Sequence, residues 1–278
     1  MADRESLAWS GNVDQLEFEG KVAIVAGGSL GIGKAAARRL ASGGASVVIC
    51  GRREDAVVTA IAEFQRDGLT VAGVPADISI SADAERVVAF AAEHFGGVDI
   101  LVNSAGIQRY GTVVDTDEAT WDEVFAINVK GMYLMAHFAI PEMHKRGGGV
   151  VVNVSSVQAF ASQKSVAAYT ASKGAINALT RAMALDHAGE HIRVVAVCPG
   201  SVDTPMLRYA ADVWKGDQTS DAMVAAWGKM HPLGRVGTPE DVAELIAFLA
   251  SDRASFMTGG AYTVDGGLLS AIAVALPE

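Results

Sequence analysis

The apolar positions of the chain fall into short continuous runs. Seven of these runs are rich in β-branched residues: "KVAIVAG", "ASVVICG", "TVAGVPA", "VDILVNS", "GVVVNVS", "IRVVAVC" and "AYTVDGG". Most segments between them have helical length, as in "GKAAARRLAS" and "SADAERVVAFAAEHFG". Continuous apolar strands that alternate with helices are typical of a parallel sheet covered on both faces. The pattern predicts an α/β doubly wound, Rossmann-like fold with a seven-stranded, mainly parallel sheet and helices on both faces.

Two stretches depart from this alternation. Residues 117–145 carry apolar residues at helical spacing, and we expect one or two helices there, with Gly131 marking a bend and Pro141 an end. Residues 206–230 interrupt the pattern with Met, Trp and charged residues. We expect this second stretch to form a flap over the substrate, although plain core packing would also explain it.

Composition limits the domain organisation and the class of partner. The 278 residues are 50% hydrophobic, enough for one large core, so we expect a single domain over residues 20–278 after an N-terminal extension, residues 1–19. The formal charge of −10 argues against nucleic acid as a partner. The extension has acids and no apolar core, and the later apolar runs fall short of the roughly 20 residues that span a bilayer, so we expect neither a signal peptide nor a membrane partner.

The chain contains two cysteines and one histidine pair that could suggest special chemistry. Cys50 and Cys198 each end an apolar run, which favours buried, reduced thiols over a disulfide and indicates a cytoplasmic protein. His187 and His191 have the spacing of a metal-binding pair. Because Gly189 lies between them and no third ligand is evident, we expect no metal site.

A glycine-rich turn follows the first predicted strand. In "AGGSLGIGKAAARRL", Gly27, Gly31 and Gly33 lie at the turn and at the start of a helix. Glycines there permit a tight turn, close approach of the backbone to a ligand and close packing of the helix on the strand. A plain strand-to-helix turn would also contain glycine, but the position after the first strand favours binding of a dinucleotide diphosphate at the helix N-terminus.

Tyr169 and Lys173 are four residues apart in "AAYTASKGA", so both lie on one face if the segment is helical. A phenol with a pKa of about 10 is a poor base at neutral pH, and a nearby ammonium would favour its ionised form. Ser156 ends another apolar run, at the sheet edge where open α/β folds bind ligands. The pair alone is too common to indicate this chemistry and by itself favours an ordinary amphipathic helix.

These motifs together resemble the short-chain dehydrogenase/reductases, from about Gly20 to Leu269. That family's turn reads Thr-Gly-x-x-x-Gly-x-Gly, and Ala26 stands here in place of the threonine. "NSAG" matches its Asn-Asn-Ala-Gly element with Ser104 as the second residue, and "CPGSVDT" matches its Pro-Gly-x-Val-x-Thr segment. "PLGRVGTPEDVAELIAFLAS" and "TGGAYTVDGG" resemble its C-terminal signature. The resemblance implies an NAD(P)-dependent oxidoreductase acting reversibly on a secondary alcohol or carbonyl group.

The resemblance also implies the roles of individual residues. Tyr169 is expected to be the acid/base, Lys173 to lower its pKa and hold the nicotinamide ribose, and Ser156 to donate to the reacting oxygen. Asn128, in "FAINVKG", is expected to support a proton relay through water. The expected cofactor contacts are Gly27, Ser29, Leu30, Gly31, Ile32, Gly33, Arg52, Arg53, Asp77, Ile78, Asn103, Ala105, Gly106, Tyr169, Lys173, Pro199, Gly200, Val202 and Thr204.

The end of the second strand bears on the choice between NAD and NADP. NAD-preferring relatives carry an Asp there, and this chain has Gly51. The absence of an acid removes repulsion of a 2′-phosphate, and Arg52 could pair with that phosphate. Alternatively, Arg52 and Arg53 only cap a solvated loop, and Leu30 occupies a place where many NADP-preferring relatives are basic. We expect NADP to be preferred, with NAD use left open.

The substrate is less clearly encoded. Gln158 and Gln163 offer amides suited to hydroxyl groups, and we expect Ser156, Gln158 and Tyr169 to contact a sugar or polyol. The alternative enzyme is a 3-oxoacyl thioester reductase acting on an acyl carrier. A catalytically silent nucleotide-binding protein is the alternative of another class, against which intact Ser156, Tyr169 and Lys173 argue. The resemblance and the apolar end "LLSAIAVALP" predict a homotetramer.

Overall fold

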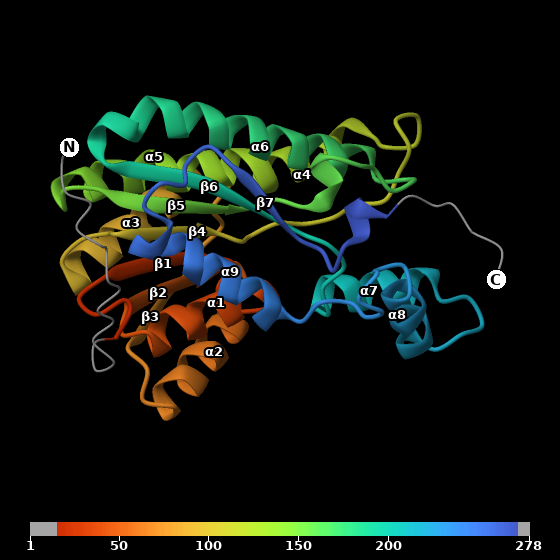
Figure 1. Cartoon of the computed structure of the whole chain (residues 1–278), viewed down its shortest axis with the longest axis horizontal. Helices are drawn as coiled ribbons and strands as arrows, with labels where there is room; N and C mark the ends of the chain where they lie inside the picture. Colours follow the sequence, from red (N-terminus) through yellow and green to blue (C-terminus); the bar gives the residue numbers. More distant parts are fainter. Residues whose placement is uncertain (1–15, 272–278) are drawn as a thin grey trace, which may run out of the picture.

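All seven apolar runs form strands of one sheet in the computed structural model, which describes residues 16–271 (Figure 1). The strands are β1 (Val22–Ala26), β2 (Ser46–Gly51), β3 (Val71–Pro75), β4 (Ile100–Asn103), β5 (Gly149–Val154), β6 (Ile192–Pro199) and β7 (Ala261–Val264). Their order is β3-β2-β1-β4-β5-β6-β7, and every neighbouring pair is parallel. The predicted doubly wound α/β fold is confirmed.

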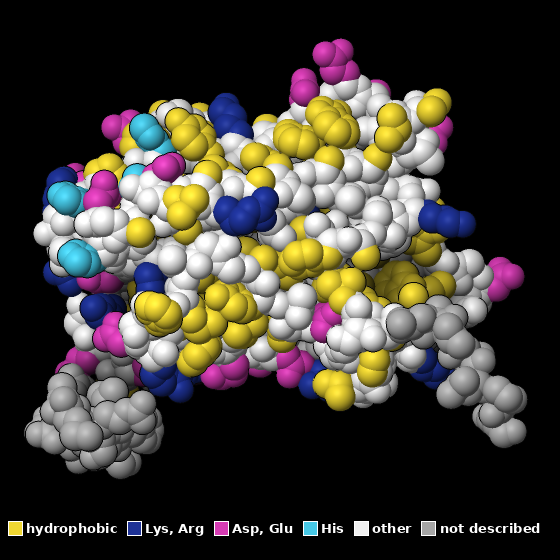
Figure 2. Space-filling view, turned by 45° about the horizontal axis from the view of Figure 1, so that its top comes forward, with side chains coloured by type: hydrophobic (Ala, Val, Ile, Leu, Met, Phe, Trp, Pro, Cys, Tyr) yellow, Lys and Arg dark blue, Asp and Glu magenta, His cyan; other side chains and the backbone are white. Residues whose placement is uncertain are grey.

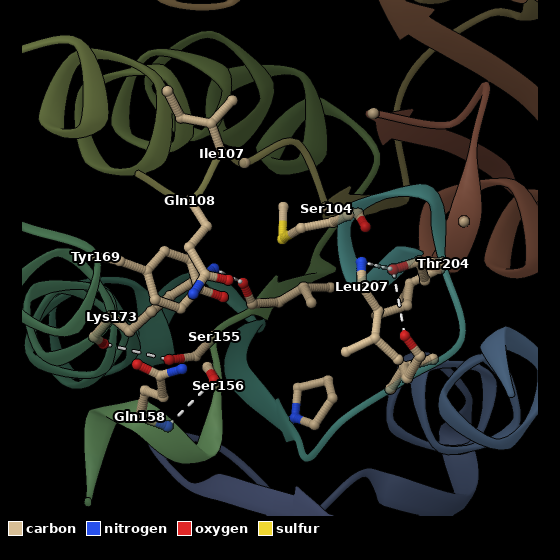
Figure 3. Close-up of a pocket in the computed structure, with 18 of the residues that line it drawn as sticks. Ser104, Ile107, Gln108, Ser155, Ser156, Gln158, Tyr169, Lys173, Thr204 and Leu207 are labelled. Atoms are coloured by element: carbon tan, nitrogen blue, oxygen red, sulfur yellow. Dashed lines mark hydrogen bonds between the residues drawn. The ribbon is translucent and has the colours of Figure 1, made fainter. Parts of the chain in front are cut away.

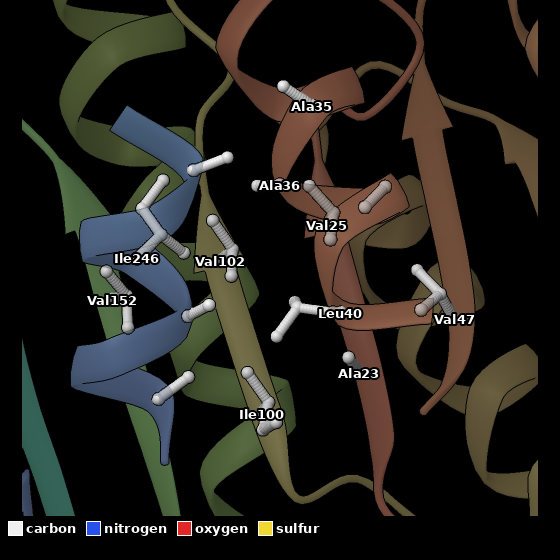
Figure 4. Close-up of a cluster of buried hydrophobic side chains, with 14 of the residues drawn as sticks. Ala23, Val25, Ala35, Ala36, Leu40, Val47, Ile100, Val102, Val152 and Ile246 are labelled. Atoms are coloured by element: carbon white, nitrogen blue, oxygen red, sulfur yellow. The ribbon is translucent and has the colours of Figure 1, made fainter. Parts of the chain in front are cut away.

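Helices cover both faces of the sheet (Figure 1). One face carries α1 (Gly31–Ser42), α2 (Glu54–Arg66) and α9 (Pro239–Ala250), and the other carries α3 (Ser81–Phe95), α5 (Gly131–Lys145) and α6 (Ala167–His187). The apolar stripe of α1 meets that of α9 over the middle of the sheet, where Leu40, Val102 and Ile246 are fully buried (Figure 4). Because both faces are buried, the strands read as continuous apolar runs.

The stretch 117–145 forms one continuous helix. It runs through α4 (Glu118–Phe125), a π turn (Ala126–Lys130) and α5. The prediction that Pro141 marks an end is wrong, since Pro141 lies inside α5, which ends at Lys145. The irregularity falls instead at the π turn, where one extra residue is inserted into the helix. By length and composition this helix could cross a bilayer. Of its apolar 18-residue stretch, however, 56% is buried inside the protein, as expected of a core helix.

The predicted flap consists of two short helices, α7 (Pro205–Trp214) and α8 (Ser220–Gly228), which project beyond one end of the sheet (Figure 1). The Thr204 and Thr219 side chains cap them by accepting hydrogen bonds from backbone N–H groups. Single 3-10 turns complete the described elements at Val157–Ala159, Ala188–Glu190, Asp252–Ala254 and Leu268–Ser270.

Packing of the domain begins before Gly20. Phe18 is buried, and its backbone N–H donates to the Gly43 oxygen over 2.6 Å, so the last residues of the expected extension belong to the packed core. The Lys and Arg side chains are scattered singly over the face shown in Figure 2 and form no continuous basic field there. Cys50 and Cys198 are both buried and free, as the sequence predicts.

Candidate active site and cofactor cleft

A cavity of about 870 Å³ opens at the carboxyl ends of the strands, between the loops that leave them and the flap. Open α/β sheets bind ligands at this edge, where the strand order reverses, here between β1 and β4. Of the nineteen expected cofactor contacts, all but Gly33 and Asn103 line this cavity. Ser156, Gln158 and Gln163 line it as well.

The glycine turn fits a dinucleotide diphosphate. Gly27 has a φ of +77°, and a Cβ there would lie 2.7 Å from the Ala105 nitrogen. Gly31 has a φ of +51°, and a Cβ there would crowd the Thr204 side chain at 3.2 Å. Helix α1 starts after Leu30 with no side-chain cap and no acid in its first turn. Its first N–H groups are therefore left for an anion, as a bound diphosphate requires.

Gly33 and Asn103 lie behind the cavity wall. A Cβ on Gly33 would be 2.2 Å from the Gly27 oxygen, so this glycine permits helix packing under the turn. The Asn103 side chain points into the sheet, where its amide donates to Asn153 Oδ1 over 3.0 Å, and its own Oδ1 has no hydrogen-bond partner in the described structure. Gly33 therefore allows α1 to pack against the glycine turn, and Asn103 links the ends of β4 and β5.

Tyr169, Lys173 and Ser156 lie close together on one wall of the cavity (Figure 3). Tyr169 and Lys173 lie one turn apart on α6, with the Lys173 Nζ 5.3 Å from the centre of the Tyr169 ring. The Lys173 ammonium donates to the Val154 oxygen over 3.0 Å at the end of β5. Ser156 follows the same strand, and its Oγ accepts from the Gln158 N–H over 3.1 Å. These contacts bring the hydroxyl, phenol and ammonium to one wall.

Burial is the largest cause of the pKa shifts of Tyr169 and Lys173. It raises the pKa of Tyr169 to about 12, opposed by the nearby Ser156 hydroxyl, and it lowers the pKa of Lys173 to about 8. Desolvation penalises the charged form of each side chain, so in the protein alone the phenol stays neutral at pH 7. The expected lowering of the Tyr169 pKa by Lys173 does not contribute in the protein without cofactor, so it remains a prediction for the protein with cofactor bound.

The π turn positions Asn128 between two elements. Its Oδ1 accepts from the Ile107 N–H over 2.8 Å, and its Nδ2 donates to the Ile107 oxygen over 2.9 Å and to Ser172 Oγ over 3.1 Å. Ser172 Oγ in turn donates to the Tyr169 backbone carbonyl oxygen over 2.7 Å. Asn128 is fully buried and does not line the cavity, so it fixes the loop after β4 against α6. The proton relay remains a prediction.

The adenosine end of the cavity lies beside β2 and β3. Arg52, Arg53 and Asp77 line it, with both arginines exposed. Arg53 lies 3.7 Å from the Asp55 carboxylate, whereas Arg52 forms no ion pair with any residue between 16 and 271. A Cβ at Gly51 would lie 2.9 Å from the Ser29 Oγ, so a side chain at this position requires Ser29 to move.

The opposite end combines amides with apolar and aromatic side chains. Thr170 donates to Gln158 Oε1 over 3.2 Å, and Gln158 Nε2 donates to Gln163 Oε1 over 3.4 Å. Met206, Leu207 and Trp227 of the predicted flap also line this end. Gln108, Tyr110, Ser162 and His231 line it as well and were not predicted from the sequence. Gln108 and Tyr110 directly follow "NSAG" at the carboxyl end of β4, and that position could have indicated them.

A Rossmann-like sheet with an uncapped glycine turn and a Ser–Tyr–Lys group in one cleft defines a nicotinamide-dinucleotide oxidoreductase. The family model described as Enoyl-(Acyl carrier protein) reductase matches residues 26–269. Human Dehydrogenase/reductase SDR family member 4 is 38% identical over 262 residues, which cover 94% of this chain and 92% of that protein. 2-(S)-hydroxypropyl-CoM dehydrogenase 3 of Xanthobacter autotrophicus is 38% identical over 251 residues, covering 90% and 97%.

A solved structure of a dehydrogenase is also similar to this chain. Thermoplasma acidophilum aldohexose dehydrogenase in ligand-free form matches with a TM-score of 0.86 and 34% identity, over 95% of this chain and 99% of that one. The chain therefore belongs to the short-chain dehydrogenase/reductase family. It is an NAD(P)-dependent oxidoreductase acting on an alcohol or carbonyl group.

Proposed function

We propose that the protein interconverts a secondary alcohol and a ketone on a neutral sugar or polyol, with NADP as the preferred cofactor. The observation that carries this proposal is the amide-lined end of the cavity. Among the described lining residues, the only charged side chains are Arg52, Arg53 and Asp77 at the adenosine end and Lys173 beside Tyr169. A substrate with a carboxylate or phosphate would find no counterion beyond Lys173, whereas hydroxyl groups match the amides.

The proposed chemistry assigns each step to a side chain. When bound, the nicotinamide accepts the hydride from an alcohol or supplies it to a ketone. Tyr169 takes the hydroxyl proton in oxidation and returns it in reduction. Ser156 donates a hydrogen bond to the same oxygen as negative charge develops there. Lys173, held by the Val154 carbonyl, keeps a positive charge beside the phenol and favours its ionised form.

A substrate panel tests the proposed class. The purified protein is assayed by nicotinamide absorbance with aldoses, polyols, cyclic ketones and 3-oxoacyl thioesters, each with NADP and NAD. We expect the highest kcat/KM with an uncharged polyhydroxylated compound. The relative named as an aldohexose dehydrogenase supports this choice. Higher kcat/KM with a 3-oxoacyl thioester than with every polyol would overturn it.

The preference for NADP rests on Arg52. Because Arg52 is exposed and unpaired among the described residues, it is available to a 2′-phosphate, while Arg53 already lies near Asp55. We expect Arg52→Ala to weaken NADP binding by up to about tenfold and to leave NAD binding unchanged, since an exposed ion pair contributes about 1 kcal/mol. Arg53→Ala is the matched control. A wild-type kcat/KM that is tenfold higher with NAD would contradict the preference.

We also propose that residues 20–278, together with Phe18, which packs in the same core, act as a single catalytic domain in a cytoplasmic protein. The two buried free thiols are compatible with a reducing compartment. Fractionation of the native cells tests the location. Recovery of the activity from an oxidising compartment would contradict it.

A further inference from the structure

His231 is a buried imidazole with no role in the chemistry described above. It follows α8 directly, lines the substrate end of the cavity and is only 3% exposed. Its Nδ1 lies 3.0 Å from the Trp227 oxygen, in the last turn of α8. Its Nε2 lies 3.2 Å from the Ser201 nitrogen, in the loop after β6. One ring therefore joins the last helix of the flap to the loop after β6, which leads into the first helix of the flap.

The two partners determine which nitrogen carries the proton. A carbonyl oxygen only accepts, so Nδ1 must donate to Trp227, and a backbone N–H only donates, so Nε2 must accept from Ser201. His231 is therefore neutral in this arrangement, with its proton on Nδ1. An imidazolium, or the other neutral tautomer, would lose the contact with Ser201 because Nε2 would carry a proton.

Three segments meet at this ring, and the missing side chain of Gly200 gives it room. A Cβ on Gly200 would lie 3.1 Å from His231 Nε2, and one on Gly266 would lie 3.5 Å from the His231 Cβ. Gly200 belongs to the loop after β6 and Gly266 to the loop after β7. Each of the three segments also contributes cavity-lining residues, such as Thr204, Trp227 and Leu268. A shift of the ring would move both ends of the cleft relative to each other.

We propose that His231 is a positioning residue that aligns the substrate flap with the Gly200–Thr204 loop through its two ring nitrogens. The Ser201 contact holds the loop that carries the expected cofactor contacts Gly200, Val202 and Thr204, and the Trp227 contact holds the flap over the substrate. The inference rests on the cofactor and substrate ends assigned under the proposed function. The two contacts are separable because each uses a different nitrogen.

Two substitutions separate the contacts. In His231→Gln, Oε1 reaches the place of Nε2 and still accepts from Ser201, but the donor to Trp227 is lost. In His231→Asn, Nδ2 occupies the place of Nδ1 and still donates to Trp227, but the acceptor for Ser201 is lost. We expect His231→Asn to raise the Kd for NADPH about tenfold, and His231→Gln to raise the substrate KM about tenfold, as the loss of one hydrogen bond predicts. The substrate KM of His231→Asn and the Kd for NADPH of His231→Gln should each stay within about twofold of the wild-type value.

NADPH binding is measured by nucleotide fluorescence, independently of turnover, and KM is measured with the best substrate of the panel. Equal effects of the two variants on both constants, or no effect of either, would overturn the proposal. Imidazole ¹⁵N NMR of the wild-type protein provides a second test, in which we expect an unprotonated Nε2 whose signal shifts on addition of NADPH. A protonated Nε2 would also overturn it. A panel without any substrate would refute the proposed function, yet NADPH binding and NMR would still decide the role of His231.

Discussion

At the scale of single residues, the site combines two groups whose burial opposes their charged forms. Tyr169 and Lys173 are both less than 10% exposed, and the Val154 carbonyl is the only hydrogen-bond partner of the Lys173 ammonium within residues 16–271. A buried ammonium without a carboxylate partner destabilises the folded protein. The pair therefore carries a cost in stability that its catalytic role would explain.

Replacement of the phenol tests the acid/base assignment. Tyr169→Phe removes the ionisable hydroxyl and almost no volume, so we expect kcat to fall by about 10²–10⁴-fold. The Kd for NADPH should stay within about twofold, because the ring remains in place. Steady-state kinetics and fluorescence titration measure the two effects. More than a tenth of the wild-type activity in this variant would rule out Tyr169 as the acid/base.

Replacement of Lys173 tests how much the buried ammonium destabilises the folded protein. Lys173 has a folded-state pKa of about 8 against an ordinary 10.5, so below pH 8 both states bind the proton and the full cost of burying the charge is present. As the pH rises from 8 toward 10.5, the folded form is neutral while the unfolded form still binds a proton, and the cost disappears. We expect Lys173→Met to stabilise the cofactor-free protein at pH 7 by about 1–3 kcal/mol, since each pKa unit is worth about 1.4 kcal/mol.

Urea unfolding at pH 7 and at pH 10 measures this difference. The stabilisation should shrink toward zero at the higher pH, while activity is lost at both. Ala is a poor replacement here because it would leave a cavity, whereas Met keeps most of the stem volume. A variant less stable than the wild type at pH 7 would show that the ammonium is well accommodated.

At the scale of elements, α9 connects the substrate end to the core. Thr238 Oγ1 accepts from the Asp241 N–H over 3.2 Å, and Asp241 accepts from the Thr238 N–H over 2.7 Å, which forms a complete capping box. We expect Thr238→Ala to lower stability by about 1 kcal/mol and the Tm by about 2–3 °C. Thr238→Ser keeps the cap and serves as the control. Equal Tm values for Ala and Ser would show that the cap contributes nothing.

The sequence predicts elements better than their details. Strands buried on both faces can be recognised in the sequence because their apolar runs are continuous. The glycine turn and the Tyr169–Lys173 pair can be recognised because their residues are close together in the sequence. Pro141 was misread because a helix buried in the core tolerates the loss of one backbone hydrogen bond. The partners of His231 lie 4 and 30 residues away, and only the folded chain brings them to one ring.

At the scale of the whole molecule, the described surface exposes several large apolar side chains. Leu185 on α6 is 82% exposed and Tyr133 on α5 is 48% exposed. Most of the apolar end "LLSAIAVALP", on which the tetramer prediction also rests, lies outside the described residues. Exposed apolar side chains on neighbouring helices are typical of subunit contacts. They support the homotetramer that the family resemblance predicts.

Light scattering tests this assembly. We expect a mass four times that of the 28.8 kDa chain at micromolar concentration. Leu185→Glu should lower the mass, because it places a charge in the expected contact, whereas Val58→Glu on α2, where Val58 is 57% exposed, should not. A monomeric wild-type protein would contradict the prediction.

The strand order has a consequence for synthesis on the ribosome. β1 is made early, yet it pairs with β4, whose first residue comes 78 positions after that of β1, and the loops after β6 and β7 that close the cleft come later still. A nascent chain that has released only β1, β2 and β3 contains the glycine turn but lacks the loops after β4 to β7 that form the rest of the cavity wall. Helix α1 then lacks its partner α9, and the apolar face that α9 covers is open to solvent. Chains stalled before β4 should therefore need chaperones and bind no nucleotide.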